Sequence, residues 1–258
     1  MIKISILTCT YNSESTIDST LQSVLCQEYD DVEHIIVDGA STDSTLQKAE
    51  EYKRQSDFSS SGHEVVILSE PDNGLYFAMN KALKMASGDY VVYLNAGDFL
   101  PDSRVVADIA ECATQSDRLP GVIYGDTDLV DLSGNFLRHR RLSPPKRLTS
   151  RSFADGMLVC HQAFYALTSL ARAIPYNIDY RYSADVDWCI RVMKAAEREG
   201  RSLRCVGRVV VNYLSEGMTT QNHKASLCER FRVMRSHYGL PLTLWKHFCF
   251  IIRSVFKR

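Results

Sequence analysis

Two carboxylates stand where apolar runs of the chain end. Asp38 follows "VEHIIV" directly, and Asp98 closes "DYVVYLNAGD" after one amide, Asn95, and two small residues. Carboxylate and amide oxygens can bind a divalent cation or accept hydrogen bonds from a polar ligand. Turn and helix N-cap preferences explain another set of polar residues better than these two: Ser15, Thr42, Asp43 and Asp102. The pattern therefore places candidate ligand-binding groups at two strand ends.

A second pair of acids opens a later helix. The segment "SADVDW" holds Asp185 and Asp187 at the start of a helix predicted over 186–198. The helix dipole favours a carboxylate in the first turn, which is enough to explain Asp187. For Asp185 the residues alone suggest an N-cap, which is compatible with a further role of the same carboxylate.

The elements that must position these side chains alternate along the first half of the chain. Apolar runs at "ISILTC", "VEHIIVDG", "EVVILSE" and "YVVYLNAGD" are each followed by a helical pattern, over 15–27, 44–55, 75–86 and 103–115. Such alternation predicts an α/β fold with a mostly parallel sheet, whose ligands lie beyond the carboxyl ends of the strands. After Gly121 the pattern is mixed, with strands at "GVIYGDTDLV", "NFLRHRRL" and "VVVNY" and helices near 166–173 and 186–198.

The composition indicates an ordinary globular protein without a nucleic-acid partner. The 258 residues include 30 basic and 31 acidic side chains, so no overall field attracts nucleic acid. The eight cysteines form no CxxC, which predicts reduced thiols in a cytoplasmic protein. No run approaches the roughly 18 apolar residues of a membrane span, and the first residues do not resemble a signal peptide. We expect one domain over 1–240 with two lobes, at 1–120 and 121–240, and a separate C-terminal helix at 241–258.

Four segments together resemble family 2 glycosyltransferases with the glycosyltransferase-A fold, a mostly parallel central sheet flanked by helices. They are "ISILTCTYNSESTIDSTLQSVLCQ", "IIVDGASTDST", "SEPDNGLYFAMNKALKMASGDYVVYLNAGD" and "SADVDWCIRV". The resemblance covers the first 215 residues or so, and four segments in register with the strand pattern are more specific than any one of them. The most similar subgroup builds bacterial capsule, exopolysaccharide or lipopolysaccharide.

The resemblance implies a role for each matching residue. Asp98 would hold Mn²⁺ or Mg²⁺, Asp185 would be the catalytic base, and His161 and Gln162 would border the acceptor. His161 could equally be structural, as a lone histidine often is. A late metal ligand could come from His223. The nucleotide-sugar donor would contact the remaining set: Thr10, Tyr11, Asn12, Asp38, Asp72, Asn73, Asn95, Ala96 and Gly97.

The chain departs from the family pattern at four positions. Gly39 stands where many relatives have a second Asp, and Asn95 and Gly97 replace acids of an Asp-x-Asp-Asp motif. Ala184 replaces an acid beside the expected base. The resemblance predicts an inverting, metal-dependent transferase that moves a sugar, most simply from a UDP-sugar, to a saccharide that is carried on a lipid. The missing acids leave open a catalytically weak nucleotide-sugar-binding subunit that supports a partner transferase. A dehydrogenase is disfavoured because no GxGxxG follows the first strand.

The last segment, 242–258, has a basic amphipathic pattern. On a helix, Trp245, Phe248 and Ile252 share a face with Val255 and Phe256, whereas Lys246, Arg253 and Lys257 lie on another. This pattern is typical of a helix at a membrane surface, here the inner face of the cell membrane, but also of a helix docked on the domain with its basic side in water. A second basic cluster, "NFLRHRRLSPPKR", could meet lipid phosphates or form a solvated loop.

Overall fold

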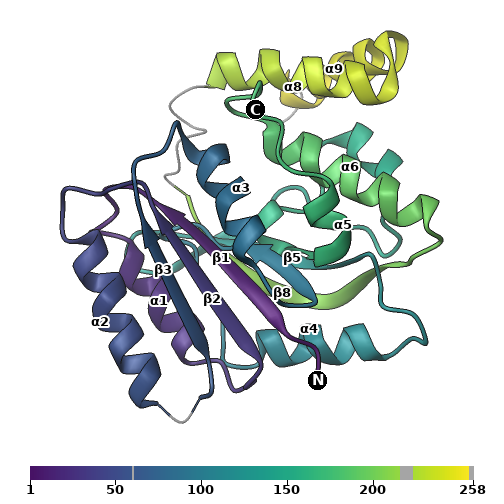
Figure 1. The fold of residues 1–258 in the computed structure, drawn as a ribbon. Coiled ribbons are helices and arrows are strands. Elements are labelled where there is room, and N and C mark those ends of the chain that lie inside the picture. Colours follow the sequence, from purple (N-terminus) through teal and green to yellow (C-terminus); the bar gives the residue numbers. More distant parts are fainter. Residues whose placement is uncertain (60, 216–222, 256–258) are drawn as a thin grey trace.

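One mixed sheet of eight strands runs through the molecule (Figure 1). The computed structural model describes residues 1–59, 61–215 and 223–255, without the side chains of 223, 224, 251 and 253–255. The strand order is β3-β2-β1-β4-β7-β5-β6, and β8 pairs with β5. The strands are β1 (Ile4–Thr10), β2 (Val32–Asp38), β3 (Glu64–Ser69), β4 (Tyr90–Tyr93), β5 (Val122–Val130), β6 (Phe136–His139), β7 (Phe164–Leu167) and β8 (Leu203–Leu214).

The first four strands are parallel, as the alternating pattern predicts. β2 and β4 flank β1, and β3 adds to β2. β7 is antiparallel to both β4 and β5, whereas β8 is parallel to β5. The carboxyl ends of β1, β2 and β4 therefore meet at one edge of the sheet. The predicted α/β fold with a mostly parallel central sheet is confirmed.

Helices cover both faces of the sheet. Successive side chains of β2 point to opposite faces and therefore pack against different helices. Ile36 packs with α1 (Ile17–Leu25) and α2 (Thr45–Phe58). Ile35 and Val37 belong to the larger core that includes α3 (Leu75–Met85). The larger core continues through α4 (Val105–Thr114), α5 (Thr168–Ala173) and α6 (Ala184–Arg198). Trp188 of α6 is stacked on Tyr176, with ring centroids 4.9 Å apart, and meets Tyr93 of β4 edge to face.

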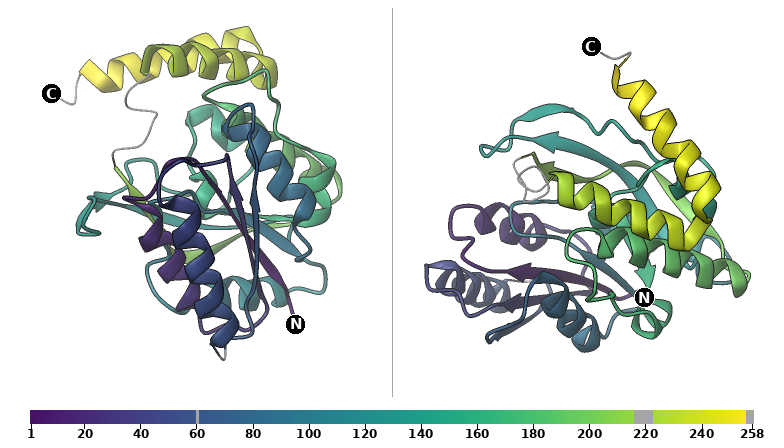
Figure 2. Two further views of the ribbon diagram at one scale, coloured as in Figure 1. Left: turned by 60° about the vertical axis from the view of Figure 1, so that its left-hand side comes forward. Right: turned by 90° about the horizontal axis from the view of Figure 1, so that it is seen from above.

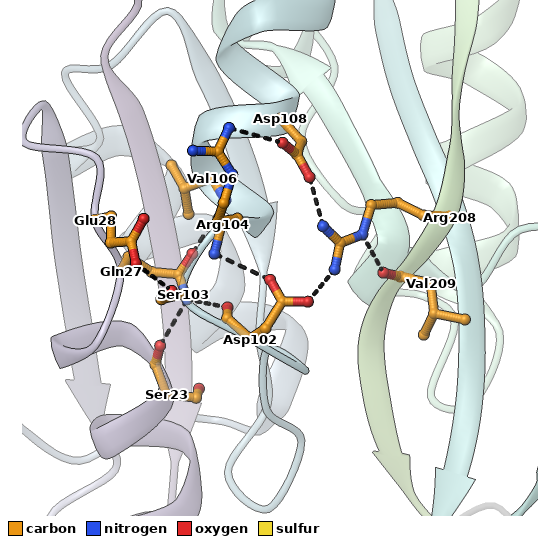
Figure 3. A network of polar contacts seen from close by, with 10 residues as sticks. All are labelled: Ser23, Gln27, Glu28, Asp102, Ser103, Arg104, Val106, Asp108, Arg208 and Val209. Atoms are coloured by element: carbon orange, nitrogen blue, oxygen red, sulfur yellow. Dashed lines mark hydrogen bonds and ion pairs between the residues drawn. The ribbon is translucent and has the colours of Figure 1, made fainter.

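The segment that follows Asp98 is held by a polar network (Figure 3). Arg208 of β8 bridges Asp102 and Asp108. Gln27 accepts from the backbone N–H of Val106 at 3.1 Å and donates to the carbonyl of Asp102 at 2.7 Å. This network ties the connection between β4 and α4 to α1 and β8, so the strand end that carries Asp98 rests on a fixed support.

Two predicted element boundaries are wrong. The helix expected from 166 begins only at Thr168, because 164–167 form β7, which fills the gap between β4 and β5. The helix expected from 186 begins at Ala184, and its N-cap is Ser183. Asp185 therefore lies inside the first turn and is not the N-cap.

Two further helices, α8 (His223–Tyr238) and α9 (Leu240–Val255), pack against each other and lie across the top of the molecule (Figure 2). Lys246 of α9 pairs with Asp155 of the short helix η1 (Ser150–Asp155) at 2.5 Å. This contact agrees with the alternative of a helix docked on the domain, although Lys246 is paired with Asp155 and its side chain is only 23% exposed. Trp245 and Phe248 are 61% and 55% exposed. Among the described residues, no helix combines the length and hydropathy that a membrane span requires.

Candidate active site

Asp98 is buried at the carboxyl edge of the sheet and joins three parts of the chain. Its Oδ2 accepts a hydrogen bond from Gln162 Nε2 at 2.7 Å, and its Oδ1 accepts from the backbone N–H of Leu214 at 2.9 Å. Gln162 lies in the short helix η2 (His161–Ala163), and Leu214 ends β8. Burial raises the pKa of Asp98 to about 6, against the opposing effect of these two hydrogen bonds. The carboxylate therefore ties the end of β4 to η2 and β8.

Gly97 is required by its backbone conformation, with φ of +99°. A Cβ at this position would lie 2.9 Å from Leu214 Cδ2. Since other residues are strained at such φ values, the glycine is explained by the loop itself, and not only by close approach of a ligand. Ala96, its neighbour, is partly exposed.

Asn95, at the end of β4, is connected to Asp185 of α6 through His161. Asn95 Nδ2 lies 3.3 Å from His161 Nε2, and His161 Nδ1 lies 3.5 Å from Asp185 Oδ2. One tautomer satisfies both contacts, because a proton on Nδ1 can face the carboxylate while Nε2 accepts from the amide. His161 is thus shared between a strand end and the start of α6. The predicted neighbours His161 and Gln162 contact Asp185 and Asp98, respectively.

Asp185 keeps one oxygen without a protein partner. Among the described residues no group donates a hydrogen bond to its Oδ1, which is buried, whereas the side chain as a whole retains 19% exposure. Burial alone would raise the pKa of Asp185, but the contact and charge of His161, the charge of Arg230 and the N–H of Val186 together lower it. The carboxylate is therefore ionised at neutral pH and able to accept a proton through Oδ1.

Asp187 is directed away from this cluster. It accepts from Arg191 Nε at 2.6 Å and contacts His237 Nε2 at 2.8 Å. These partners lie on α6 and α8, so Asp187 joins the two helices. Its assignment to a role in the helix, and not in catalysis, agrees with this geometry.

The loops after β1 and β2 form the other side of the edge. Tyr11 is 62% exposed, and Asn12, with φ of 48°, accepts from the backbone N–H of Thr42 at 2.9 Å. The hydroxyl of Thr10 is buried and has no hydrogen-bond partner. Asp38 is fully buried and accepts from Ser41 and from Ser69 Oγ at 2.7 Å. A nucleotide base would have to displace these serines to reach it, so base recognition by Asp38 stays a prediction.

Asp72 occupies the space beside Gly39. A Cβ at Gly39 would lie 3.0 Å from Asp72 Oδ2 and 3.3 Å from the ring of Tyr11. Asp72 Oδ1 accepts from the backbone N–H of Gly74 at 2.7 Å, which fixes the carboxylate in place. Asn73 next to it is exposed. Asp72, on the loop after β3, therefore places a carboxylate beside Gly39. Gly39 is the position on the loop after β2 where many relatives carry an Asp.

The donors available for a metal ion are few. Across the described residues, no group of three His, Cys, Asp or Glu side chains converges on one point. Asp98 is the one acid at the end of β4, and its two hydrogen bonds use two of about four acceptor positions of a carboxylate. The donor set thus fits an ion that takes one protein carboxylate and is held mainly by ligand phosphates and water. The side chain of His223 lies outside the described part.

Two charged residues of α8 near Asp185 were not predicted from the sequence. Arg230 lowers the pKa of Asp185, and its buried Nε has no hydrogen-bond partner in the part of the chain that the structure describes. Glu229 accepts hydrogen bonds from the loop before α6. Neither has a motif or spacing that relates it to Asp185, 44 or more positions earlier in the chain. Only the packing of α8 on α6 brings them to the site.

Comparison with known proteins identifies the class. Residues 5–168 match the family described as Glycosyl transferase family 2. The chain is also 31% identical over 188 residues to a PGL/p-HBAD biosynthesis glycosyltransferase of Mycobacterium bovis, an overlap that covers 72% of this chain and 68% of that protein. The chain therefore belongs to glycosyl transferase family 2. The matched segment includes Asp38, Asp98 and His161 but ends before Asp185.

Solved structures support the fold. Staphylococcus aureus TarS 1-349 in complex with UDP-GlcNAc has a TM-score of 0.71 at 21% identity, over 91% of this chain and 65% of that one. Glucosyl-3-phosphoglycerate synthase from Mycobacterium tuberculosis, in complex with Mn²⁺, UDP and glucosyl-3-phosphoglycerate, has a TM-score of 0.60 at 18% identity, over 93% and 81%. This chain thus spans about two thirds of the TarS chain, and the similarity at these identities is one of fold.

Proposed function

We propose that this protein is an inverting glycosyltransferase that moves a sugar from a nucleotide-diphosphate sugar, most simply a UDP-sugar, to a saccharide acceptor. The observation that carries the proposal is the contact between Asp185 and His161 next to the strand end with Asn95 and Asp98. It supports a general base at Asp185, because an ionised carboxylate whose buried Oδ1 has no donor among the described residues lies near the carboxyl edge of the sheet, where ligands of such folds bind. The relatives at 31% identity are named PGL/p-HBAD biosynthesis glycosyltransferases, which supports transfer of a sugar. We propose in addition that the acceptor is lipid-linked and belongs to the synthesis of a bacterial surface polysaccharide.

The residues of the chain would share the chemistry as follows. Asp185 Oδ1 takes the proton of the acceptor hydroxyl while the acceptor oxygen bonds to the anomeric carbon. The bond from that carbon to the diphosphate breaks at the same time, and the nucleoside diphosphate leaves with the electron pair. His161 keeps the carboxylate ionised and oriented through its 3.5 Å contact. A divalent ion, when bound, would neutralise the charge of the diphosphate, with Asp98 as its protein ligand.

The donor would lie over the loops after β1, β2 and β3. Tyr11 offers an exposed aromatic face, and rings of this kind stack on flat ligands. Asp72 and Asn73 border the same place, and Asn12 shapes the loop. We propose that Asn95, Ala96 and Gly97 present the end of β4 to the ribose and diphosphate.

Donor binding is testable without knowledge of the acceptor. A UDP-sugar at about 100 times its dissociation constant should stabilise the fold by roughly 2.7 kcal/mol, because it binds the folded state alone. A thermal-shift screen of UDP-glucose, UDP-galactose and UDP-N-acetylglucosamine, with and without Mn²⁺, measures this, and ATP with Mn²⁺ is the control for unspecific phosphate binding. Release of UDP from the stabilising donor then reports turnover. If no nucleoside diphosphate or nucleotide sugar raised the melting temperature, the proposed function would be wrong.

The same screen separates the alternative function. The absence of acids at Asn95, Gly97 and Ala184 favours a nucleotide-sugar-binding subunit that supports a partner transferase. Stabilisation by a donor without release of UDP, over a panel of saccharide acceptors, would favour that subunit. Turnover by the purified chain would exclude it.

We further propose that α9 contacts a membrane surface. Its apolar residues Leu244, Trp245 and Phe248 are each more than half exposed, and Ile252 is 38% exposed. The sequence adds the positive charges of Arg253, Lys257 and Arg258, whose side chains lie outside the described part. Exposed aromatic residues with nearby basic charge are typical of helices that lie at a lipid interface.

Replacement of Trp245 and Phe248 by Ser should weaken binding to anionic vesicles at least roughly tenfold, because each side chain loses the gain from burial in lipid. Co-sedimentation with phosphatidylglycerol vesicles measures this. Phe58→Ser is the matched control, since Phe58 at the end of α2 is 91% exposed and lies on another part of the surface. Equal binding by the double variant and the wild type would contradict a membrane contact through α9.

A further inference from the structure

The carboxylate of Glu229 is buried against the loop that enters α6. Its Oε1 accepts from the backbone N–H of Arg181 at 2.8 Å, and its Oε2 accepts from those of Tyr182 and Ser183 at 2.5 and 2.6 Å. Glu229 itself is 9% exposed. Three successive backbone N–H groups that converge on one anion form a strong binding site for it, because bonds to an ionised acceptor exceed those to a neutral one. Glu229 therefore holds the loop at three consecutive points.

This loop has no comparable local support. Ser183 is the N-cap of α6, but its side chain makes no capping hydrogen bond to the helix. The N-terminus of a helix favours anions, and Glu229 of α8 adds one beside Asp185 and Asp187 of the first turn of α6. Asp185 follows Ser183 by two residues, so a displacement of the loop moves its carboxylate directly. The position of Asp185 thus depends on a contact with a residue 44 positions later in the chain.

The helix that carries Glu229 is itself fixed on α6. His237, near the end of α8, contacts Asp187 at 2.8 Å, and Lys194 of α6 lies 3.1 Å from the other ring nitrogen of His237. α8 is therefore attached at two points, to the loop before α6 through Glu229 near its middle and to α6 through His237 near its end. Such a two-point attachment transmits the position of α8 to the first turn of α6.

From this geometry we propose that Glu229 is a positioning residue for the general base: it holds the loop 181–183 so that Asp185 stays against His161 with Oδ1 free. The inference rests on the proposed role of Asp185 and extends the site to α8, outside the family-matched segment. Other titratable groups also surround Asp185: His161 of η2, Arg230 of α8, Tyr76 of α3, Cys189 of α6, Tyr213 of β8, Cys160 and Tyr176. Removal of the Glu229 contacts would loosen Asp185 from His161 and let burial raise the pKa of the base.

The test compares Glu229→Gln with a matched buried carboxylate. Glu33 is 3% exposed and accepts from Ser87 N–H at 2.8 Å and Ser5 Oγ at 2.6 Å, at the opposite end of the strands. The substrate is the UDP-sugar that stabilises the wild type most, and the readouts are kcat for UDP release, its pH profile, and UDP binding. We expect Glu229→Gln to lower kcat roughly tenfold or more, since small misplacements of a catalytic group cost that much. We also expect the acid limb of the profile to move to higher pH, with UDP affinity within about twofold, and Glu33→Gln to change stability alone.

Other variants keep the outcome decisive. Glu229→Asp retains the charge and should recover part of kcat. If Glu229→Gln folds poorly, Glu229→Asp with its shorter side chain replaces it, and faster amide hydrogen exchange of residues 181–185 together with wild-type kcat would overturn the proposal. Wild-type kcat and an unmoved acid limb in Glu229→Gln would also overturn it. Asp185→Asn in the same assay separates the assignment of the base from the role of Glu229. If Asp185→Asn turns over normally, the assignment of Asp185 as the base is wrong. If Asp185→Asn is inactive but Glu229→Gln is normal, only the positioning role of Glu229 is refuted.

Discussion

Replacement of Asp185 by Asn should lower kcat by roughly 10² to 10⁴, the usual contribution of a general base. The amide retains the size of the side chain, so donor binding should stay within about twofold of the wild type. The physical reason is that an amide oxygen cannot take the acceptor proton, whereas the wild-type carboxylate is ionised at neutral pH and has a free Oδ1. Steady-state release of UDP, with the donor dissociation constant from thermal shift, measures both quantities.

Asp187→Asn provides the control two residues away. Its carboxylate pairs with Arg191 and His237, so its loss should cost about 1–3 kcal/mol of stability and leave kcat nearly unchanged. If the two variants exchanged behaviour, with Asp185→Asn active and Asp187→Asn inactive, the base would have been assigned to the wrong acid of "SADVDW".

Replacement of Asp98 by Asn should raise the half-saturating concentration of Mn²⁺ by roughly 10- to 100-fold. Removal of a group that only hydrogen-bonds a metal ligand weakens metal binding by this factor, and removal of the ligand itself should weaken it at least as much. The amide can keep the hydrogen bond from Leu214 N–H, so the loop should survive, whereas Asp98→Ala would lose both ties. Asp102→Asn, on the same segment but paired with Arg208, is the control. Unchanged Mn²⁺ dependence in Asp98→Asn would show that Asp98 is only a structural tie.

The same variant should change how stability depends on pH in the absence of metal. Burial raises the pKa of Asp98 from 3.8 to about 6. A carboxyl group with a raised folded pKa contributes its stability fully below the unfolded value and loses it as pH rises through the folded value. Between about pH 4 and 7, the wild type should therefore lose about 3 kcal/mol relative to Asp98→Asn, from roughly 1.4 kcal/mol per pKa unit. Urea unfolding at a series of pH values measures the difference, and parallel curves for the two proteins would contradict it.

The sequence predicted the parts of the site that depend on local pattern. Apolar runs followed by turn residues place Asp38, Asn95 and Asp98 at strand ends, and parallel strands bring those ends together. The pairings within the site were not predictable in the same way. Gln162 meets Asp98 because β7 inserts next to β4, and the sequence pattern had assigned part of β7 to a helix.

Contacts from the C-terminal helices were the least predictable. The amphipathic pattern identifies α9 as a helix with exposed aromatic residues, but it cannot show that Asp155 lies beneath Lys246. Glu229 likewise has no neighbour in the sequence that indicates an anion-binding loop at 181–183. Interactions of this kind depend on tertiary packing across long chain separations, for which a single sequence carries no periodic signal.

The two glycines in place of family acids have a consequence for the acids that this site can carry. At Gly39 a new side chain would press on Asp72, and at Gly97 it would meet Leu214 in a backbone conformation that only glycine adopts easily. A single substitution to Asp at either position would thus have to displace Asp72 or Leu214 before the new carboxylate could bind anything. This backbone therefore accommodates the fuller acid motif only together with changes at 72 or 214, and the site relies on the few carboxylates that it has.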